Sequence, residues 1–155
     1  AAERFPGGRV GVMATEVTLR EEKLHTLLVQ YPQTEFIPIP APGVVELVEQ
    51  GKADSPEMDA LLEKLLSFHK GKLDGLVLGC THYPFVKKAI RRVLGEIPLF
   101  DGGEGTARHC KALLAERALL AEGPGSVEIE NSLGCDRILA LSTALLKDTE
   151  EAQHG

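Results

Sequence analysis

The stretch from Asp74 to Pro84 constrains the fold of this chain most strongly. After Asp74 the chain is continuously apolar to Leu78, as expected for a strand that is covered on both faces of a sheet. Gly79 then allows a turn or the close approach of a ligand, and a thiol, a hydroxyl and an imidazole follow it. Pro84 suits the first position of a helix. A buried strand thus carries reactive side chains to a strand–helix junction, where open α/β sheets bind ligands.

Strand and helix patterns alternate through the first two thirds of the chain. Pro38 interrupts one apolar segment, so we expect that strand at an edge of the sheet or at a strand end. Repeated alternation predicts an α/β fold, in which a parallel sheet is flanked by helices. The predicted strands are 9–14, 35–39, 75–78 and 97–100, and the predicted helices are 18–30, 44–50, one from Pro56, 85–94 and 104–120.

The regular alternation of strand and helix patterns ends after Ala121. Alternating apolar and acidic residues predict a strand over 126–131, a last helix is predicted over 135–147, and a polar tail over 150–155. The turn at 102–105 is rich in glycine. It has neither the Lys-Ser/Thr pair of a P-loop nor GxGxxG spacing, so it does not predict a nucleotide site.

Composition narrows the classes of function. The 155 residues are 43% apolar and 26% charged, which is ordinary for a globular protein with a real core. The net charge of −6 offers no broad basic surface for nucleic acid. Four cations on helix 85–94 are interpreted as a solvated face near a helix C-terminus. No apolar run could span a membrane and no signal peptide is evident, so we predict neither membrane association nor secretion.

The three cysteines, Cys80, Cys110 and Cys135, are an odd number without paired spacing. They predict free thiols and a reducing, cytoplasmic location. His109 and Cys110 lie on one predicted element, whereas Cys80 and His82 lie on another. This arrangement has no metal-ligand spacing, and no metal site is predicted.

Cys80, Thr81 and His82 each have an ordinary alternative role. A cysteine after a buried strand is often a small apolar residue, a threonine can cap a helix, and a loop histidine can simply be hydrogen-bonded. All three together, between Gly79 and Pro84, favour chemistry instead. The free N–H groups of a helix start nearby would favour a thiolate or an anion.

The motif LGCTHYP at 78–84 resembles the second signature of the glutamate racemases, in the cofactor-independent aspartate/glutamate racemase superfamily. The resemblance implies a flavodoxin-like racemase domain and no cofactor. It covers most of residues 1–120, with order and spacing kept. Three further stretches support it: 8–18 looks like GRIGVIATEGT, 42–51 is similar to PxxVxLVEEG, and 100–103 resembles the segment that re-enters the first domain.

The resemblance also implies a reaction, the interconversion of L- and D-glutamate. Two thiols exchange the roles of base and acid on opposite faces of the small-molecule substrate, and in the family this supplies D-glutamate for peptidoglycan and the cell wall. Cys80 would be one thiol, and His82 a proton donor or polarising group. Val17 stands where the family has glycine, so the family's backbone conformation is not expected to carry over to this turn unchanged. The implied site residues are Cys80, Thr81, His82, Thr15 and Thr18, together with Glu49, which matches a family glutamate near the active site.

The family's other catalytic cysteine, in a CNT-type motif ahead of the GRIGV stretch, has no counterpart here, and neither do its DSG and YG motifs. We therefore interpret 1–99 as the second α/β domain of a racemase. Residues 100–155 are interpreted as the segment that returns to the first domain, the N-terminal part of which is absent. The isolated chain should then be inactive. The apolar faces of helices 104–120 and 135–147 should be exposed, which favours a homodimer or another association, or else a disordered tail.

Three alternatives stay open at the level of sequence. The chain could be an aspartate or hydantoin racemase of the same superfamily. It could be a truncated, non-catalytic binding domain in which Cys80 is only a reactive thiol. A Cys–His hydrolase is a weaker alternative, because no orienting Asp or Asn is evident.

Overall fold

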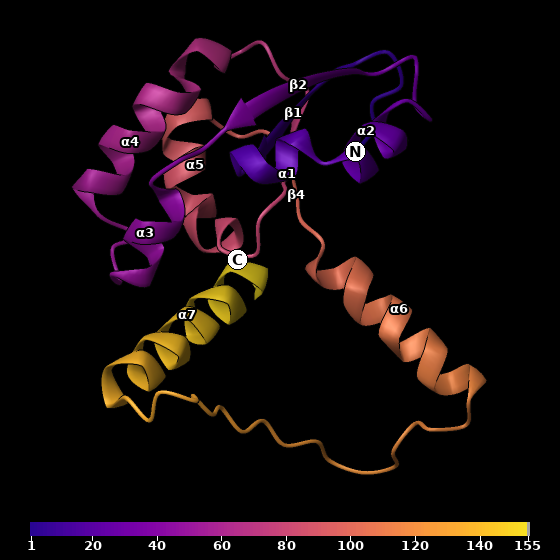
Figure 1. The fold of residues 1–155 in the computed structure, drawn as a ribbon, viewed down its shortest axis with the longest axis vertical. Coiled ribbons are helices and arrows are strands. Elements are labelled where there is room, and N and C mark those ends of the chain that lie inside the picture. The colour runs from indigo at the N-terminus through magenta and orange to yellow at the C-terminus, as the bar shows by residue number, and fades with distance from the viewer. Residues whose placement is uncertain (155) are drawn as a thin grey trace. The chain divides into compact units, whose positions relative to one another are not determined.

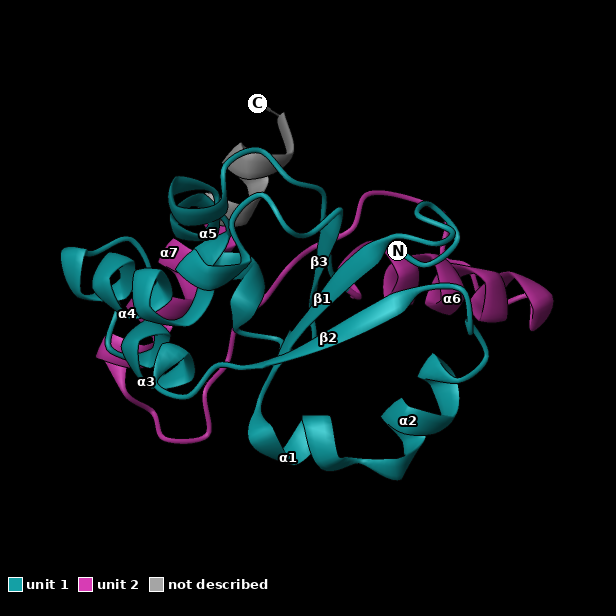
Figure 2. Ribbon diagram, turned by 90° about the horizontal axis from the view of Figure 1, so that it is seen from above, with its two compact units in different colours: residues 1–101 teal, residues 102–155 magenta. Residues whose placement is uncertain are grey.

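The structure is a computed structural model that describes the backbone of residues 1–154 and the side-chain environments of residues 1–147. It contains two compact units, Ala1–Asp101 and Gly102–Gly155 (Figure 2). Each unit is described by itself below.

The first unit is built on a parallel sheet, as the alternation of strands and helices predicts. The sheet has four strands in the order β2-β1-β3-β4, and helices flank it (Figure 1). The strands are β1 Arg9–Ala14, β2 Glu35–Pro40, β3 Gly75–Leu78 and β4 Leu99–Phe100. The helices are α1 Glu16–Arg20, α2 Glu22–Leu28, α3 Val44–Glu49, α4 Pro56–Leu66 and α5 Lys87–Leu94, with 3-10 turns η1 Ser67–His69 and η2 Tyr83–Val86.

The position of β2 confirms the expectation from its proline. Pro38 has no N–H to donate to a ladder, and β2 lies at one edge of the sheet, paired only with β1. The two central strands, β1 and β3, are short and apolar, and they are buried along most of their length. Since all four strands run the same way, their carboxyl ends lie at one edge of the sheet.

The core lies between one face of the sheet and the helices α3, α4 and α5, which Figure 2 shows together on that side. Met13 and Leu78 are register partners on this face and are almost completely buried. The amphipathic helix α4 buries Met58, Leu62 and Leu66 at the predicted helical spacing. Burial of each such side chain stabilises the fold by about 1.5–3 kcal/mol.

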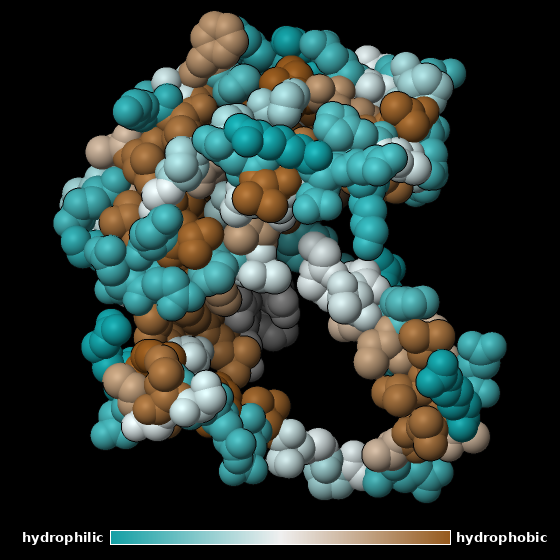
Figure 3. All heavy atoms as spheres, viewed as in Figure 1, coloured by the Kyte–Doolittle hydropathy of each residue, from teal (hydrophilic) through white to brown (hydrophobic). Residues whose placement is uncertain are grey.

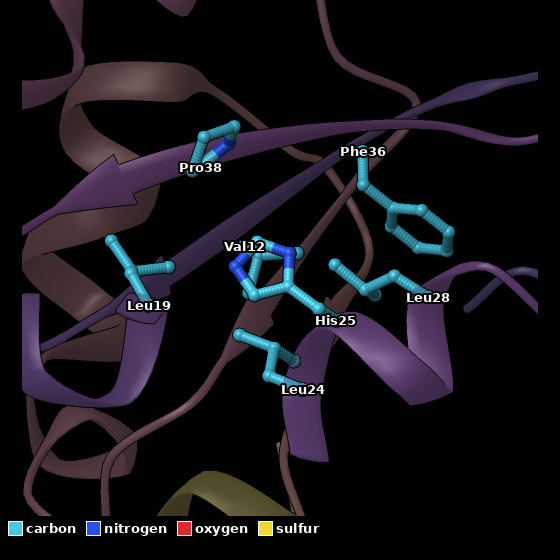
Figure 4. A pocket seen from close by; sticks show the side chains of 7 residues that line it. All are labelled: Val12, Leu19, Leu24, His25, Leu28, Phe36 and Pro38. Carbon is cyan, nitrogen blue, oxygen red and sulfur yellow. The ribbon is translucent and has the colours of Figure 1, made fainter. Parts of the chain in front are cut away.

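The helix predicted over 18–30 is instead two short helices, α1 and α2. Glu21 separates them with an extended backbone, ψ 128°. In one continuous helix Leu19 and Leu24 would point about 140° apart. The break turns both of them toward the sheet, where they line a cavity of about 170 Å³ over Val12 (Figure 4). The incomplete apolar stripe of this segment is the sequence signal for the break.

The second unit consists of α6 Gly103–Glu116, α7 Asp136–His154 and an irregular connection. The strand predicted over 126–131 is wrong, because these residues pair with no strand and alternation alone cannot hold an unpaired strand. The polar tail predicted from Glu150 is wrong as far as His154, since α7 includes these good helix formers. Gly155 lies outside the described residues.

The apolar side chains of α6 are at the surface, as Figure 3 shows along this helix. Leu113 is 38% exposed to solvent and Leu114 is 37% exposed, and no residue of α6 is buried. This agrees with the expected exposed face of the helix predicted over 104–120. Among the described residues, no helix is both long and apolar enough to cross a membrane.

Candidate functional site

Two candidate segments lie at the carboxyl edge of the sheet, on neighbouring strands. Met13 of β1 and Leu78 of β3 are register partners, and Thr15 and Cys80 follow each of them by two residues. Neighbouring strands lie about 4.8 Å apart. The sheet therefore presents the Thr15 segment and the Cys80 segment side by side.

Gly79 permits this close approach. Its N–H donates to the carbonyl oxygen of Met13 at 2.8 Å. A Cβ at position 79 would lie 3.0 Å from the Cβ of Ala14 and 3.2 Å from the oxygen of Met13. The sequence predicts that Gly79 allows a turn or the approach of a ligand; the structure shows instead that it allows close packing of β3 against β1.

The helix expected to begin at Pro84 begins as a 3-10 turn. Pro84 occupies an early position of η2, and the α-helical geometry of α5 starts only at Lys87. The N–H of Tyr83 donates to the carbonyl oxygen of Cys80 at 3.1 Å. This turn fixes the backbone that presents Cys80, Thr81 and His82.

An imidazole connects the thiol to a carboxylate. The Nε2 atom of His82 lies 2.6 Å from Oε1 of Glu49, and its Nδ1 atom lies 3.9 Å from the Sγ atom of Cys80. Glu49 is the last residue of α3, so two elements far apart in the sequence meet here. The His82 side chain is 28% exposed and that of Glu49 is 60% exposed. The group is therefore open to solvent on the carboxylate side.

The carboxylate determines which nitrogen of His82 carries the proton. An ionised Glu49 can only accept hydrogen bonds, so Nε2 must be the donor. In the neutral imidazole Nδ1 is then an acceptor, and it faces the thiol. The hydroxyl of Thr81 also lies at 3.5 Å from Nδ1. The geometry places a proton acceptor next to the sulfur of Cys80.

The two candidate threonines of the first loop form a separate pair. Thr15 caps α1, because its hydroxyl oxygen accepts from the N–H of Thr18 at 3.2 Å. Their hydroxyls are 2.9 Å apart. Their side chains make no hydrogen bond to Cys80 or His82 among the described residues. The structure thus brings Cys80, Thr81, His82 and Glu49 into contact. Over residues 1–147, Thr15 and Thr18 make no such contact, and they are near this group only because β1, which they follow, is the neighbour of β3.

Tyr83 is a buried member of the site region that the sequence did not single out. Its side chain is 0% exposed, and its hydroxyl donates to the carbonyl oxygen of Ala41 at 3.2 Å. Burial, with smaller contributions from Cys80 and Glu46, raises the pKa of Tyr83 to about 12. The hydrogen bond ties the loop after β2 to the loop after β3. The sequence signal that could have identified Tyr83 is its position within LGCTHYP, next to the reactive residues.

The other two cysteines lie in the second unit, and all three thiols are free. Cys110 is exposed on α6. Cys135 precedes α7, and hydrogen bonds from the backbone N–H groups of Ile138 and Arg137 lower the pKa of its thiol. In the part of the chain that the structure describes, no three His, Cys, Asp or Glu side chains are placed to hold a metal ion.

The basic face of α5 is largely paired with acidic side chains. Lys87 lies 2.5 Å from Asp101, which follows β4. Arg92 contacts both Asp54 and Asp59. The sequence pattern predicts a solvated face; the side chains of Lys87 and Arg92 are 29% and 44% exposed, so it is partly solvated and their charges are paired with carboxylates.

The fold and these contacts define a class: an open parallel α/β protein with a thiol, an imidazole and a carboxylate at the carboxyl edge of its sheet. No protein-family model matches the chain. Curated proteins do match it. A glutamate racemase of Clostridium kluyveri is 39% identical over 145 residues, and one of Clostridium acetobutylicum is 40% identical over 150 residues. These matches cover 91% and 94% of this chain.

Solved structures agree with the sequence matches. A glutamate racemase from Thermus thermophilus superposes with a TM-score of 0.70 at 28% identity, covering 93% of this chain and 55% of that one. One from Francisella tularensis gives a TM-score of 0.74 at 22% identity, which supports the fold. The chain is therefore a relative of the glutamate racemases, as its motifs predict. It spans 56% and 59% of the length of the two Clostridium relatives.

Proposed function

We propose that this chain forms one side of a glutamate racemase active site, with Cys80 as one of two acid/base groups. The observation that carries the proposal is the contact of His82 with both Cys80 and Glu49 at the carboxyl edge of the sheet. The sequence similarity to glutamate racemases over more than nine tenths of the chain supports the choice of substrate. Solved relatives are described with D-glutamate and with L-glutamate bound.

In the proposed mechanism the thiolate of Cys80 removes the α-proton of one enantiomer. His82 takes the thiol proton at Nδ1, because Glu49 keeps the proton of the neutral ring on Nε2. Thr81, Thr15 and Thr18 supply hydroxyl groups at the same edge to hold the substrate. The reaction needs only side chains that give and take protons, so we propose no cofactor.

Inversion also needs a proton donor on the opposite face of the substrate carbon. We assign this donor to the portion of the racemases that the present chain does not match. The 155 residues alone should then not racemise glutamate. Within this proposal the complete site supplies D-glutamate for peptidoglycan.

We also propose that the apolar face of α6 packs against a protein surface, either that remaining portion or a second copy of this chain. Leu113 and Leu114 support this, since both stay more than one third exposed. Apolar faces of this kind usually mark an interaction site.

A chimera tests the proposed reaction. The matched portion of the Clostridium acetobutylicum racemase is replaced by this chain, and conversion of L- to D-glutamate is followed by circular dichroism. We expect racemisation by the chimera and none by the 155-residue chain. Cys80→Ala should lower the rate of the chimera by about 10³-fold or more, because a positioned acid/base group contributes about 10²–10⁴-fold.

Cys110→Ser is the matched control, since this thiol lies outside the proposed site. It should leave the rate of the chimera unchanged. A folded chimera that racemises equally well with Cys80→Ala would contradict the assignment of the base. A chimera that exchanges the α-proton of aspartate but not that of glutamate would overturn the substrate.

A further inference from the structure

We propose that Cys80, His82 and Glu49 also form a nucleophilic triad that hydrolyses small activated esters, an activity that the 155-residue chain has on its own. The three groups all belong to the first unit, so this activity needs no second acid/base group. It does not depend on the proposed racemisation. The substrate class is an ester with a small acyl group and a good leaving group.

The carboxylate supplies the feature that a Cys–His hydrolase needs and that the sequence did not reveal. A nucleophilic thiol requires a base within reach and a third group that orients the base. Glu49 lies 33 residues before His82, yet its Oε1 atom is 2.6 Å from Nε2. The other ring nitrogen faces the sulfur at 3.9 Å, within the range of a hydrogen bond to sulfur. The order thiol, imidazole, carboxylate is that of a hydrolytic triad.

The surroundings of the thiol allow an ester to approach. Cys80 is partly exposed and Thr81 is exposed. In the described part of the chain, the backbone N–H groups of Cys80 and Thr81 donate to no acceptor. They are thus available to hydrogen-bond the carbonyl oxygen of an ester at the sulfur. Donors of this kind stabilise the negative charge that develops on that oxygen.

Hydrolysis of the ester needs water as its only other reactant. His82 takes the proton of the thiol, and the sulfur of Cys80 attacks the ester carbonyl, forming a C–S bond. The C–O bond to the leaving group breaks, and the imidazolium gives its proton to the departing oxygen or, where the leaving group departs as an anion such as p-nitrophenolate, to solvent water, which restores the neutral imidazole. His82 then takes a proton from water, which attacks the thioester. The C–S bond breaks, the acid is released, and the proton restores the thiol.

The other two thiols provide a comparison within the chain. Backbone N–H groups lower the pKa of the Cys135 thiol, which favours its thiolate, but no imidazole contact accompanies it among the described residues. Cys110 is an exposed thiol on a helix. Both can be acylated, and among residues 1–147 neither thiol contacts an imidazole that could activate water for the second step. Only Cys80 should therefore catalyse repeated hydrolysis of the ester, whereas the other two thiols should remain acylated.

The test uses p-nitrophenyl acetate and the full 155-residue chain. The Cys110→Ser/Cys135→Ser variant, in which Cys80 is the only thiol, should release p-nitrophenolate continuously over many turnovers. Adding Cys80→Ala to this variant should reduce the rate to that of buffer. Cys80→Ala alone should give at most a stoichiometric release from the remaining thiols, and mass spectrometry should find their acetyl groups retained.

Glu49 acts through His82, so it is a positioning residue, and its test must separate orientation from folding. Glu49→Gln should lower kcat about tenfold with KM unchanged, because the amide no longer fixes the proton on Nε2. Glu49→Asp, which keeps the charge on a shorter chain, should recover part of this loss. His82→Gln should lower kcat about 10²-fold or more. Circular dichroism spectra of all variants should match that of the parent.

Stoichiometric release without turnover from the Cys80-only variant would overturn the proposal. So would steady turnover that persists after Cys80→Ala, or equal rates with Glu49→Gln and the parent. None of these outcomes bears on racemisation, which is measured on the chimera with glutamate. The two proposals can therefore fail separately.

Discussion

The helices α4 and α6 both carry an apolar stripe, yet only one of them is buried. In α4, Met58, Leu62 and Leu66 are 0% exposed, because the helix packs against α5 and contacts β2. In α6, Leu113 and Leu114 keep more than one third of their exposure. All buried side chains among residues 1–147 belong to the first unit. The difference teaches that an amphipathic pattern predicts a helix, whereas burial depends on the surface that another element provides.

The largest effect should come from truncating equivalent leucines in the two helices. Leu62→Ala should lower the free energy of unfolding by about 3 kcal/mol, since it removes buried methylene groups and leaves a cavity. Leu114→Ala should change it by less than about 0.5 kcal/mol, as is usual for an exposed position. Urea denaturation followed by circular dichroism measures both values.

Equal destabilisation by Leu114→Ala and Leu62→Ala would contradict the contrast between a buried α4 and an exposed α6. That result would mean that α6 is buried in solution, for instance in a dimer. Repeating the measurement over a range of chain concentrations separates the cases, because only a dimer becomes more stable as concentration rises. A concentration-dependent midpoint would support the proposed association through α6.

Much of the first unit could be predicted from sequence, because its elements have strong local signals. Pro38 indicated an edge strand, and the spacing in α4 indicated its buried face. The second unit was predicted less well. The alternation over 126–131 looked like a strand, but a strand exists only with a hydrogen-bonding partner, and no local pattern shows whether one is present.

The candidate site shows the same limit. The motif at 78–84 identified Cys80 and His82 as a pair, and the structure places them in contact. The contact between His82 and Glu49 joins residues 33 positions apart. Family resemblance pointed to Glu49, whereas spacing in the chain could not, because the contact depends on how α3 packs against η2, which follows His82. The link from Tyr83 to Ala41 was missed for the same reason.

The next largest effect is a pH dependence that is specific to the first unit. The folded state raises the pKa of Tyr83 from 10.0 to about 12, so the unfolded chain loses this proton first. The contribution of the Tyr83 phenol to the free energy of unfolding is fully present below pH 10 and is lost as the pH rises toward 12. The free energy of unfolding should fall by about 2–3 kcal/mol over this interval from Tyr83 alone.

Tyr83→Phe isolates this contribution, because other groups also titrate at high pH. The variant should be about 1 kcal/mol less stable at neutral pH, since it leaves the buried carbonyl oxygen of Ala41 without its donor. Its stability should then fall less steeply between pH 10 and 12 than that of the parent. Parallel pH profiles for the two proteins would show that the phenol is not buried in solution.

A smaller effect is expected where the site depends on close backbone packing. Gly79→Ala adds a Cβ that would lie 3.0 Å from the Cβ of Ala14, so β1 and β3 must separate slightly at their carboxyl ends. Overpacking of this kind costs about 1–3 kcal/mol, and we expect about 1–2 kcal/mol here because only one methyl is added. Gly105→Ala in α6 is the matched control. Its Cβ meets nothing within 4 Å, and thermal denaturation should show no loss of stability.

The smallest effect should come from the ion pairs of the first unit, and it tests whether burial alone explains the stability of that unit. Arg92 lies 2.6 Å from Asp59 and 2.7 Å from Asp54, but its side chain is 44% exposed. Arg92→Met should therefore cost at most about 1 kcal/mol, and a double-mutant cycle with Asp59→Asn should give a coupling energy of about 0.5 kcal/mol that decreases in high salt. The pair of Arg20 and Glu16, at 79% and 60% exposure, should show almost no coupling. A coupling above about 2 kcal/mol at Arg92 would mean that the ion pairs of α5 with α4 and the loop before it hold the unit together as much as a core leucine does.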